Sequence, residues 1–113
     1  MATMRKALIA VNDVLAFVLP ASRNGAFGIQ YGTQGDDDAT AAAGTYIAEA
    51  TIDAKTWYPL KITKNDKTDV DTLAAPGLGY CEAPGYTQAR VRCTIAGGGA
   101  GHGAMISVNP REG

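Results

Sequence analysis

Few side chains in this sequence could do covalent or acid–base chemistry. His102 is the sole histidine, and no acid partner or nucleophile is identifiable near it in the sequence. A Ser-His-Asp or Cys-His arrangement assembles only in the folded chain, so sequence spacing leaves it open, although a structural or surface histidine is the favoured interpretation. Because no acid, base and nucleophile converge in the sequence, we expect no enzyme activity.

The two cysteines, Cys81 and Cys93, are the next candidates for chemistry. Two thiols without companion histidines cannot complete the four ligands of a structural zinc site. Cys93 shares an apolar strand face with Val91 and Ile95, which is typical of a small buried hydrophobic residue. We therefore expect two free thiols rather than a disulfide.

Two further stretches have the composition of ligand sites without the required spacing. Asp36, Asp37 and Asp38 could bind a hard cation, but consecutive side chains point in different directions and match no EF-hand, which favours a solvated loop. Residues 99–104 match G-x-G-x-x-A, but an extended segment follows where a dinucleotide site needs a helix. We expect a flexible turn there, and no metal or cofactor.

Arg90 and Arg92 lie two residues apart and form a small basic stripe on one strand face. They could bind carboxylates of a neighbouring subunit in bidentate geometry. They could equally pair within the chain with Glu49 or Asp53, which would contribute little. Both alternatives stay open. A sugar-stacking platform could be formed by some of the five tyrosines, although several must serve the core: Tyr31, Tyr46, Tyr58, Tyr80 and Tyr86.

The stretch around the only tryptophan predicts a β-hairpin. Two apolar-alternating runs flank a polar turn at residues 53–56, and Trp57 follows the turn directly. The first run places alternate side chains on one face, and a second strong run over residues 89–95 supplies partners for it. The candidate core anchors are Trp57, Tyr46, Ile52, Val91 and Ile95.

The N-terminal region predicts two short strands, at residues 7–11 and 14–19, separated by Asn12 and Asp13. That polar pair also interrupts the apolar stretch that a secretory signal would need. Because both runs are continuously apolar, we expect them to be covered on both faces. We therefore divide the chain into residues 1–20, an arm with the first strands that could pair across to another subunit, and residues 21–113, a β-sandwich. The candidate interface residues are Arg90, Arg92, Leu15 and Phe17.

Length and composition limit the classes of protein that remain. The chain has 113 residues, enough for one domain, and 14 glycines separate its short apolar runs. A net charge of −1 offers no electrostatic footprint for nucleic acid or an anionic membrane. No stretch has convincing helical periodicity. The pattern predicts an all-β protein, an antiparallel sandwich of the jelly-roll or immunoglobulin-like type with about seven to nine short strands.

Three motifs in order carry a resemblance to a known class of proteins. The hairpin I-D-x-x-T-W-Y-P-L at residues 52–60 precedes A-P-G-Y-T-Q-A-R-V-R-C-T at residues 83–94, and A-M-I-S-V follows at residues 104–108. This order resembles the small β-sandwich structural proteins of tailed bacteriophage virions, over residues 25–108. Similar motifs occur in head decoration, head-fibre, tail and baseplate proteins. The turn before the tryptophan usually carries glycine in those proteins, whereas Ala54 and Lys55 stand here.

The resemblance implies a non-enzymatic virion component, most like a capsid decoration (cement) protein. Such a protein binds the outer shell as a small homo-oligomer, with the major capsid protein or other virion proteins as partners. Assembly in the bacterial cytoplasm agrees with free cysteines. The alternative is a tail or baseplate module that binds host-surface carbohydrate or a receptor. That alternative predicts exposed aromatic residues beside loop carboxylates such as Asp36, Asp37 and Asp38.

Overall fold

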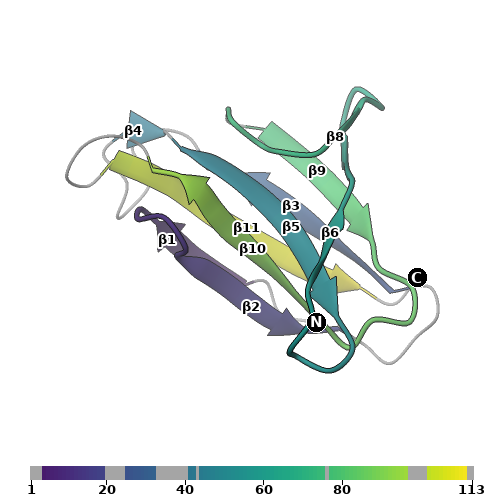
Figure 1. Cartoon of the computed structure of the whole chain (residues 1–113). Coiled ribbons are helices and arrows are strands. Elements are labelled where there is room, and N and C mark those ends of the chain that lie inside the picture. Colours follow the sequence, from purple (N-terminus) through teal and green to yellow (C-terminus); the bar gives the residue numbers. More distant parts are fainter. Residues whose placement is uncertain are drawn as a thin grey trace.

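A computed structural model of the chain describes residues 4–19, 25–32, 41–42, 44–75, 77–96 and 102–111. Within this part the chain is all-β, as the sequence predicts (Figure 1). No helix there is long and apolar enough to cross a membrane. Eleven strands are formed, more than expected, because four of them have only two or three residues each. The strands are β1 (Met4–Leu8), β2 (Val14–Val18), β3 (Ala26–Tyr31), β4 (Ala41–Ala42), β5 (Thr45–Thr51), β6 (Tyr58–Leu60), β7 (Ile62–Lys64), β8 (Asp69–Val70), β9 (Gly77–Glu82), β10 (Gln88–Ile95) and β11 (His102–Arg111).

The strands form two sheets that pack face to face, which confirms the predicted antiparallel sandwich (Figure 1). The large sheet has the order β1-β11-β3-β9-β7-β8, with antiparallel neighbours throughout, and β4 adds a short parallel pair beside β11. The small sheet has the order β2-β10-β5-β6 and is also antiparallel. The chain crosses between the sheets several times, and the shortest crossing is Lys61, the single residue between β6 of the small sheet and β7 of the large one.

The core lies between the sheets and follows the two-residue period of the strands. In β10, Ala89, Val91 and Cys93 are buried while the residues between them reach the outer face. The rings of Phe17 and Phe27 meet edge to face at 4.9 Å and join β2 to β3 across the interior. Tyr46 and Val91 are buried, as expected for core anchors.

Tyr46 is a large polar side chain at the centre of this interface. It is fully buried on β5, and its hydroxyl donates a hydrogen bond of 2.6 Å to the carbonyl of Leu8 on β1. Its ring meets Tyr31 of β3 edge to face at 5.3 Å. Tyr31 in turn donates to the carbonyl of Gly44 at 3.0 Å. Since β5 belongs to the small sheet and β1 and β3 to the large one, Tyr46 joins the two layers.

The N-terminal strands belong to the sandwich, so the expected division at residue 20 is wrong for the described part of the chain. β1 pairs with β11 and β2 pairs with β10, and the two form one edge of each sheet. The prediction that the N-terminal strands are covered on both faces is also wrong, because β2 alternates between buried and exposed side chains. Leu15 and Phe17 point into the chain's own core and are not free to form an interface.

The predicted hairpin is present. Two of the proposed core anchors, Ile52 and Ile95, are on the surface. β5 and β6 are antiparallel, with Ala48 opposite Leu60 and Ala50 opposite Tyr58. Ile52 lies just beyond the end of β5, outside the pairing that would fix its direction, and is 68% exposed. Ile95 is 62% exposed because a register shift between Cys93 and Ile95 interrupts the alternation of β10.

Side-chain hydrogen bonds shape the turn between β5 and β6. The Asp53 carboxylate accepts from the backbone N–H groups of Lys55 at 2.9 Å and Thr56 at 3.0 Å. The Thr51 hydroxyl accepts from the Ala54 N–H at 3.0 Å and donates to the Thr56 carbonyl at 2.7 Å. Ala54 has a φ of 62°, in the left-handed region that an L-residue adopts at a cost.

Replacing Ala54 with glycine is therefore expected to stabilise the protein. The left-handed conformation costs an L-residue about 1–2 kcal/mol, and the extra freedom of an unfolded glycine offsets about 0.5–1 kcal/mol of that gain. Urea unfolding should show a higher midpoint for Ala54→Gly. The control is Lys55→Gly, which removes no left-handed L-residue and should lower the midpoint. An Ala54→Gly midpoint at or below that of the parent would contradict this account of the turn.

Candidate functional site

A cluster of charged and aromatic side chains covers the outer face of the small sheet. Glu49 lies at the middle of β5, directly opposite Arg90 of β10, and is only 7% exposed. Its Oε1 atom accepts from Nε of Arg90 at 2.9 Å and from Nε of Arg92 at 3.0 Å. Of the two alternatives for the arginine pair, the structure therefore shows pairing within the chain, with Glu49 as the acceptor.

Trp57 and Asn12 complete this group, which we call the arginine cluster: Asn12, Glu49, Trp57, Arg90 and Arg92. The guanidinium of Arg90 lies 4.0 Å from the centre of the half-buried Trp57 ring, a cation–π contact. Nη1 of Arg92 donates to Oδ1 of Asn12 at 3.0 Å. Trp57 was expected to be a core anchor. That expectation is wrong, because its ring packs on Arg90 at the outer face of the sheet. Two guanidinium groups share one carboxylate, so the cluster keeps one net positive charge.

The charge state of Glu49 follows from these contacts. Burial by itself raises the pKa of a carboxyl group, but the hydrogen bonds and charges of Arg92 and Arg90 outweigh it. The pKa of Glu49 lies below its ordinary value, so the side chain is ionised at neutral pH. A carboxylate held in this way is a structural anion and makes a poor general base.

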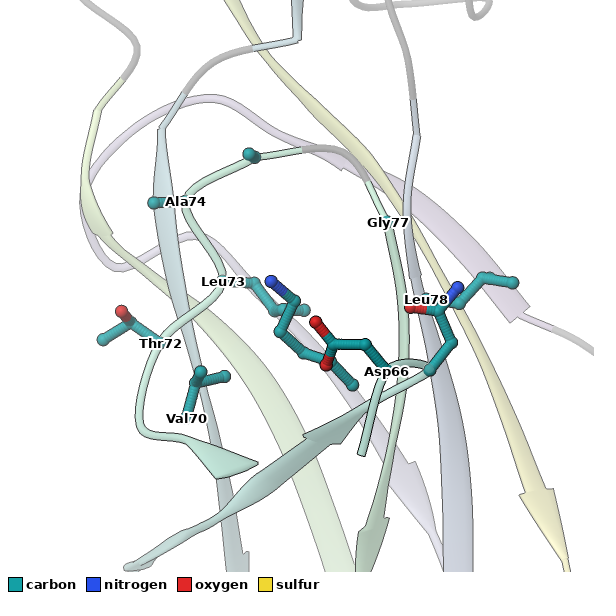
Figure 2. Close-up of a pocket in the computed structure, with 10 residues that line it drawn as sticks. Asp66, Val70, Thr72, Leu73, Ala74, Gly77 and Leu78 are labelled. Atoms are coloured by element: carbon teal, nitrogen blue, oxygen red, sulfur yellow. The ribbon is translucent and has the colours of Figure 1, made fainter. Parts of the chain in front are cut away.

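A pocket lies where the β7–β8 turn faces the segment that leads to β9. Its volume is about 440 Å³, and Figure 2 shows the side chains of Asp66 and Leu73 directed towards it. Leu73 is held by two backbone hydrogen bonds with Tyr46, of 2.9 and 2.8 Å. The polar lining comes from the exposed β7–β8 turn, including Lys64 and Asp66. Among the described residues of the lining there is no histidine or cysteine, and the one acid, Asp66, is exposed.

A second depression lies on the outer face of the large sheet, over β11, β3 and β9, and we call it the large-sheet hollow. Its volume is about 480 Å³. It is open at Gly28, which has no side chain, and uncharged polar side chains surround that position. Sequence analysis missed this site because its residues come from three strands that are far apart in the chain. The lining residues are Gly28, Ile29, Gln30, Leu78, Gly79, Ser107, Val108 and Asn109.

Several predicted sites fall outside the described residues, among them Asp36, Asp37, Asp38 and the glycines at 99 and 101. His102 begins β11 and is paired with Ala41 in the strand register. A strand therefore follows the glycine-rich stretch, and it does not provide the helix N-terminus that a dinucleotide site needs. Among the described residues, no group of three histidine, cysteine or acidic side chains is placed to hold a metal ion.

The tyrosines do not form one platform. Tyr31 and Tyr46 are in the core, and Tyr86 packs partly against it. Tyr58 on β6 and Tyr80 on β9 are exposed, but they belong to different sheets. The exposed aromatic cluster that a glycan-binding alternative predicted is thus reduced to single tyrosines in the described part of the chain.

Both cysteines are free and buried, in agreement with the expectation from the sequence. Burial raises the pKa of Cys81 to about 12, so its thiol stays protonated at neutral pH. The pKa of Cys93 is also raised, first by burial and then by the nearby charge of Asp13. Neither thiol has the character of a nucleophile.

We expect the native protein to resist thiol reagents. Incubation with 5,5′-dithiobis(2-nitrobenzoic acid) at neutral pH should modify neither cysteine, because each thiol is protonated and buried. The same reagent in denaturant should modify both, and this sample is the positive control. Rapid modification of Cys81 or Cys93 in the folded protein would contradict this prediction, because it would show that the core between the sheets opens readily.

Comparisons with known proteins give a similarity of fold and none of sequence. No family model matches the sequence, and no curated protein is similar to it in sequence. Among solved structures, the SPBc2 prophage-derived protein YomS has a similar fold, with a TM-score of 0.58. The superposition covers 94% of this chain and 100% of that protein, at 8% sequence identity. At this identity the similarity shows a shared fold.

Proposed function

We propose that this chain is a non-enzymatic structural protein of a phage virion, of the capsid decoration type. The observation that carries the proposal is the fold, which matches a prophage-derived protein over nearly the whole of both chains. The motifs at residues 52–60, 83–94 and 104–108 independently resemble those of virion β-sandwich proteins. Two lines of similarity therefore point to a phage origin.

The chemistry of the described side chains supports a role without catalysis. The most buried carboxylate, Glu49, is neutralised by two arginines, and the two thiols are protonated and buried. In the lining of the β7–β8 pocket the one acid, Asp66, is exposed and hydrogen-bonded to the backbone N–H of Thr68. These groups interact within the chain itself, which agrees with a protein that binds and stabilises a larger assembly.

The arginine cluster is the proposed contact surface for the major capsid protein. Tryptophan and arginine contribute most often to the binding energy of protein interfaces, and Trp57 and Arg90 are stacked together here. The cluster's net positive charge suits an acidic patch on the shell. A protein that binds the assembled lattice and not its free subunits stabilises the particle by mass action.

The free cysteines support assembly in the bacterial cytoplasm, where thiols remain reduced. The protein would then join the particle before release from the host. The proposed state on the shell is a small homo-oligomer, with the large sheet left facing outward.

The first experiment is the copy number per purified particle, measured by quantitative mass spectrometry against the major capsid protein. The particles to be purified are those of the phage whose genome encodes this chain. Hundreds of copies would support a shell decoration protein. A few to a few tens would overturn that role and favour the tail or baseplate alternative. Complete absence would overturn the assignment to the virion.

A further inference from the structure

The large-sheet hollow is organised by two rows of side chains that run across three strands. In one row Gly28 of β3 lies between Asn109 of β11 and Tyr80 of β9. In the next row Gln30 lies between Ser107 of β11 and Leu78 of β9. All of these positions are on the outer face, since the alternate residues of β3 are buried in the core. The missing side chain of Gly28 forms the centre of the depression.

Neither the backbone nor the packing requires glycine at position 28. β3 is an interior strand, and its pairing with both neighbours runs through Gly28 without a shift in register. An added Cβ would meet only the Gly79 carbonyl oxygen, at 3.9 Å, which is an ordinary contact. At Gly79, in contrast, a Cβ would lie 2.7 Å from Cγ2 of Ile62, so glycine is needed there.

A glycine in the interior of a strand lowers stability, because it gains no packing and loses more backbone entropy than other residues. Such a residue marks a bulge, a bend or a place where a ligand or another backbone approaches closely. The continuous register at Gly28 removes the first explanation, and ordinary space around its Cβ removes a packing requirement. Both observations agree with a place kept open for a ligand.

The side chains around the hollow define what kind of occupant fits. In the lining, Gln30 and Asn109 offer amide donors and acceptors, and Ser107 offers a hydroxyl group. Tyr80 is outside the lining, and the strand register places it beside Gly28. Gln30 and Asn109 are exposed and Ser107 is half-buried, so their polar groups are open to a ligand. Tyr80 is 44% exposed and Leu78 is 52% exposed, so an apolar surface stands beside the polar groups. No charged side chain lines the hollow.

We propose that the large-sheet hollow binds an uncharged carbohydrate of one or two hexose units. Adjacent sugar hydroxyls both donate and accept, which matches side-chain amides, while the C–H face of a hexose packs on an exposed tyrosine ring. The volume of about 480 Å³ is within the range of small-molecule sites, roughly 300–1,000 Å³. A peptide fits less well, because its backbone needs regular hydrogen bonds and the strands here already use theirs on each other.

The test is a titration of the ¹⁵N-labelled full chain, followed by two-dimensional NMR. The probes are the methyl glycosides of glucose, galactose, mannose and N-acetylglucosamine, and the disaccharides maltose, lactose and N,N′-diacetylchitobiose. We expect saturable shifts in the amides of Gly28, Gln30, Gly79 and Ser107 with at least one of them. Shifts that do not saturate with any probe would overturn the proposal.

Three variants locate the binding. Gly28→Thr fills the hollow, and Tyr80→Ala removes the ring, so each should weaken binding about tenfold or more. Tyr58→Ala is the matched control, because Tyr58 is 54% exposed on the other sheet and should leave binding unchanged. Urea unfolding should show that Gly28→Thr is at least as stable as the parent, since threonine is favoured in strands. Binding that survives both hollow variants would overturn the assignment.

Other occupants would give different results. Shifts at the same amides on raising the protein concentration without sugar would assign this face to a second copy of the chain and overturn the proposal. Glucuronic acid and N-acetylneuraminic acid are titrated alongside the neutral sugars, and shifts with these acids alone would overturn the uncharged character of the ligand. Copy number per particle does not depend on the hollow, so failure here leaves the proposed virion role to its own experiment.

Discussion

Replacing Tyr46 with alanine is expected to lower the free energy of unfolding by about 3–5 kcal/mol, the range for loss of a large buried aromatic side chain. Tyr46 is fully buried, packs its ring edge to face with Tyr31, and bonds the carbonyl of Leu8. The variant leaves a cavity between the sheets and removes a hydrogen bond that joins them. Urea unfolding followed by the fluorescence of Trp57 measures the change.

A more conservative variant separates the hydroxyl from the ring. Tyr46→Phe keeps the aromatic contact and leaves the Leu8 carbonyl without its side-chain donor, so we expect a loss of about 1–2 kcal/mol. Tyr58→Ala is the control for loss of an exposed tyrosine and should change stability by about 0.5 kcal/mol or less. If Tyr46→Ala were no more destabilising than Tyr58→Ala, the contact between β5 and β1 would not hold the layers together.

The second large effect is expected at Glu49. Glu49→Ala leaves the guanidinium groups of Arg90 and Arg92 facing each other without their shared anion. Breaking a buried ion pair costs about 3–5 kcal/mol, and about a quarter of each arginine side chain remains exposed to water, so we expect about 2–3 kcal/mol. The unfolding free energy at neutral pH measures this loss. Lys61, whose salt bridge with Asp71 is exposed, gives the matched control: Lys61→Ala should change stability little.

The same site should give a defined pH dependence. The pKa of Glu49 is lower in the folded protein than its ordinary value of 4.5, so the folded state binds the proton more weakly than the unfolded state. Ionised Glu49 therefore contributes its full stabilisation above pH 4.5. This stabilisation is lost as the pH falls through the pKa of Glu49 in the folded protein. The difference in unfolding free energy between the parent and Glu49→Gln should be constant at neutral pH and shrink below 4.5. A difference that grows on acidification would contradict this charge assignment.

Local periodicity predicted part of the fold, because strands such as β3 and β10 alternate between buried and more exposed side chains. β10 is the clearest example, because the alternation of its sequence predicts which of its residues are buried, including Val91. Ile95 departs from the pattern at a register shift, which depends on pairing with β5 and leaves no local signal. Leu15 and Phe17 were misread for the opposite reason: a continuous apolar run hides which face is buried, and only the packed partner sheet decides it.

The candidate sites were harder to predict because they depend on register between distant strands. Pairing of Glu49 with the two arginines was one of two open alternatives, and only the alignment of β5 with β10 decides between them. The large-sheet hollow needs the alignment of β3 with both β9 and β11. Its one local signal was Gly28, a glycine at an outward position inside an alternating strand.

The position of β11 in the large sheet has a consequence for how the protein is made. β11 lies between β1 and β3, although it is the last of the described strands to leave the ribosome. β1 must therefore wait on the nascent chain for a partner about a hundred residues later, and β2 must wait for β10. A prematurely terminated product that lacks residues 102–111 would expose the unpaired edges of both β1 and β3. The large sheet is therefore complete only after residues 102–111 have been made.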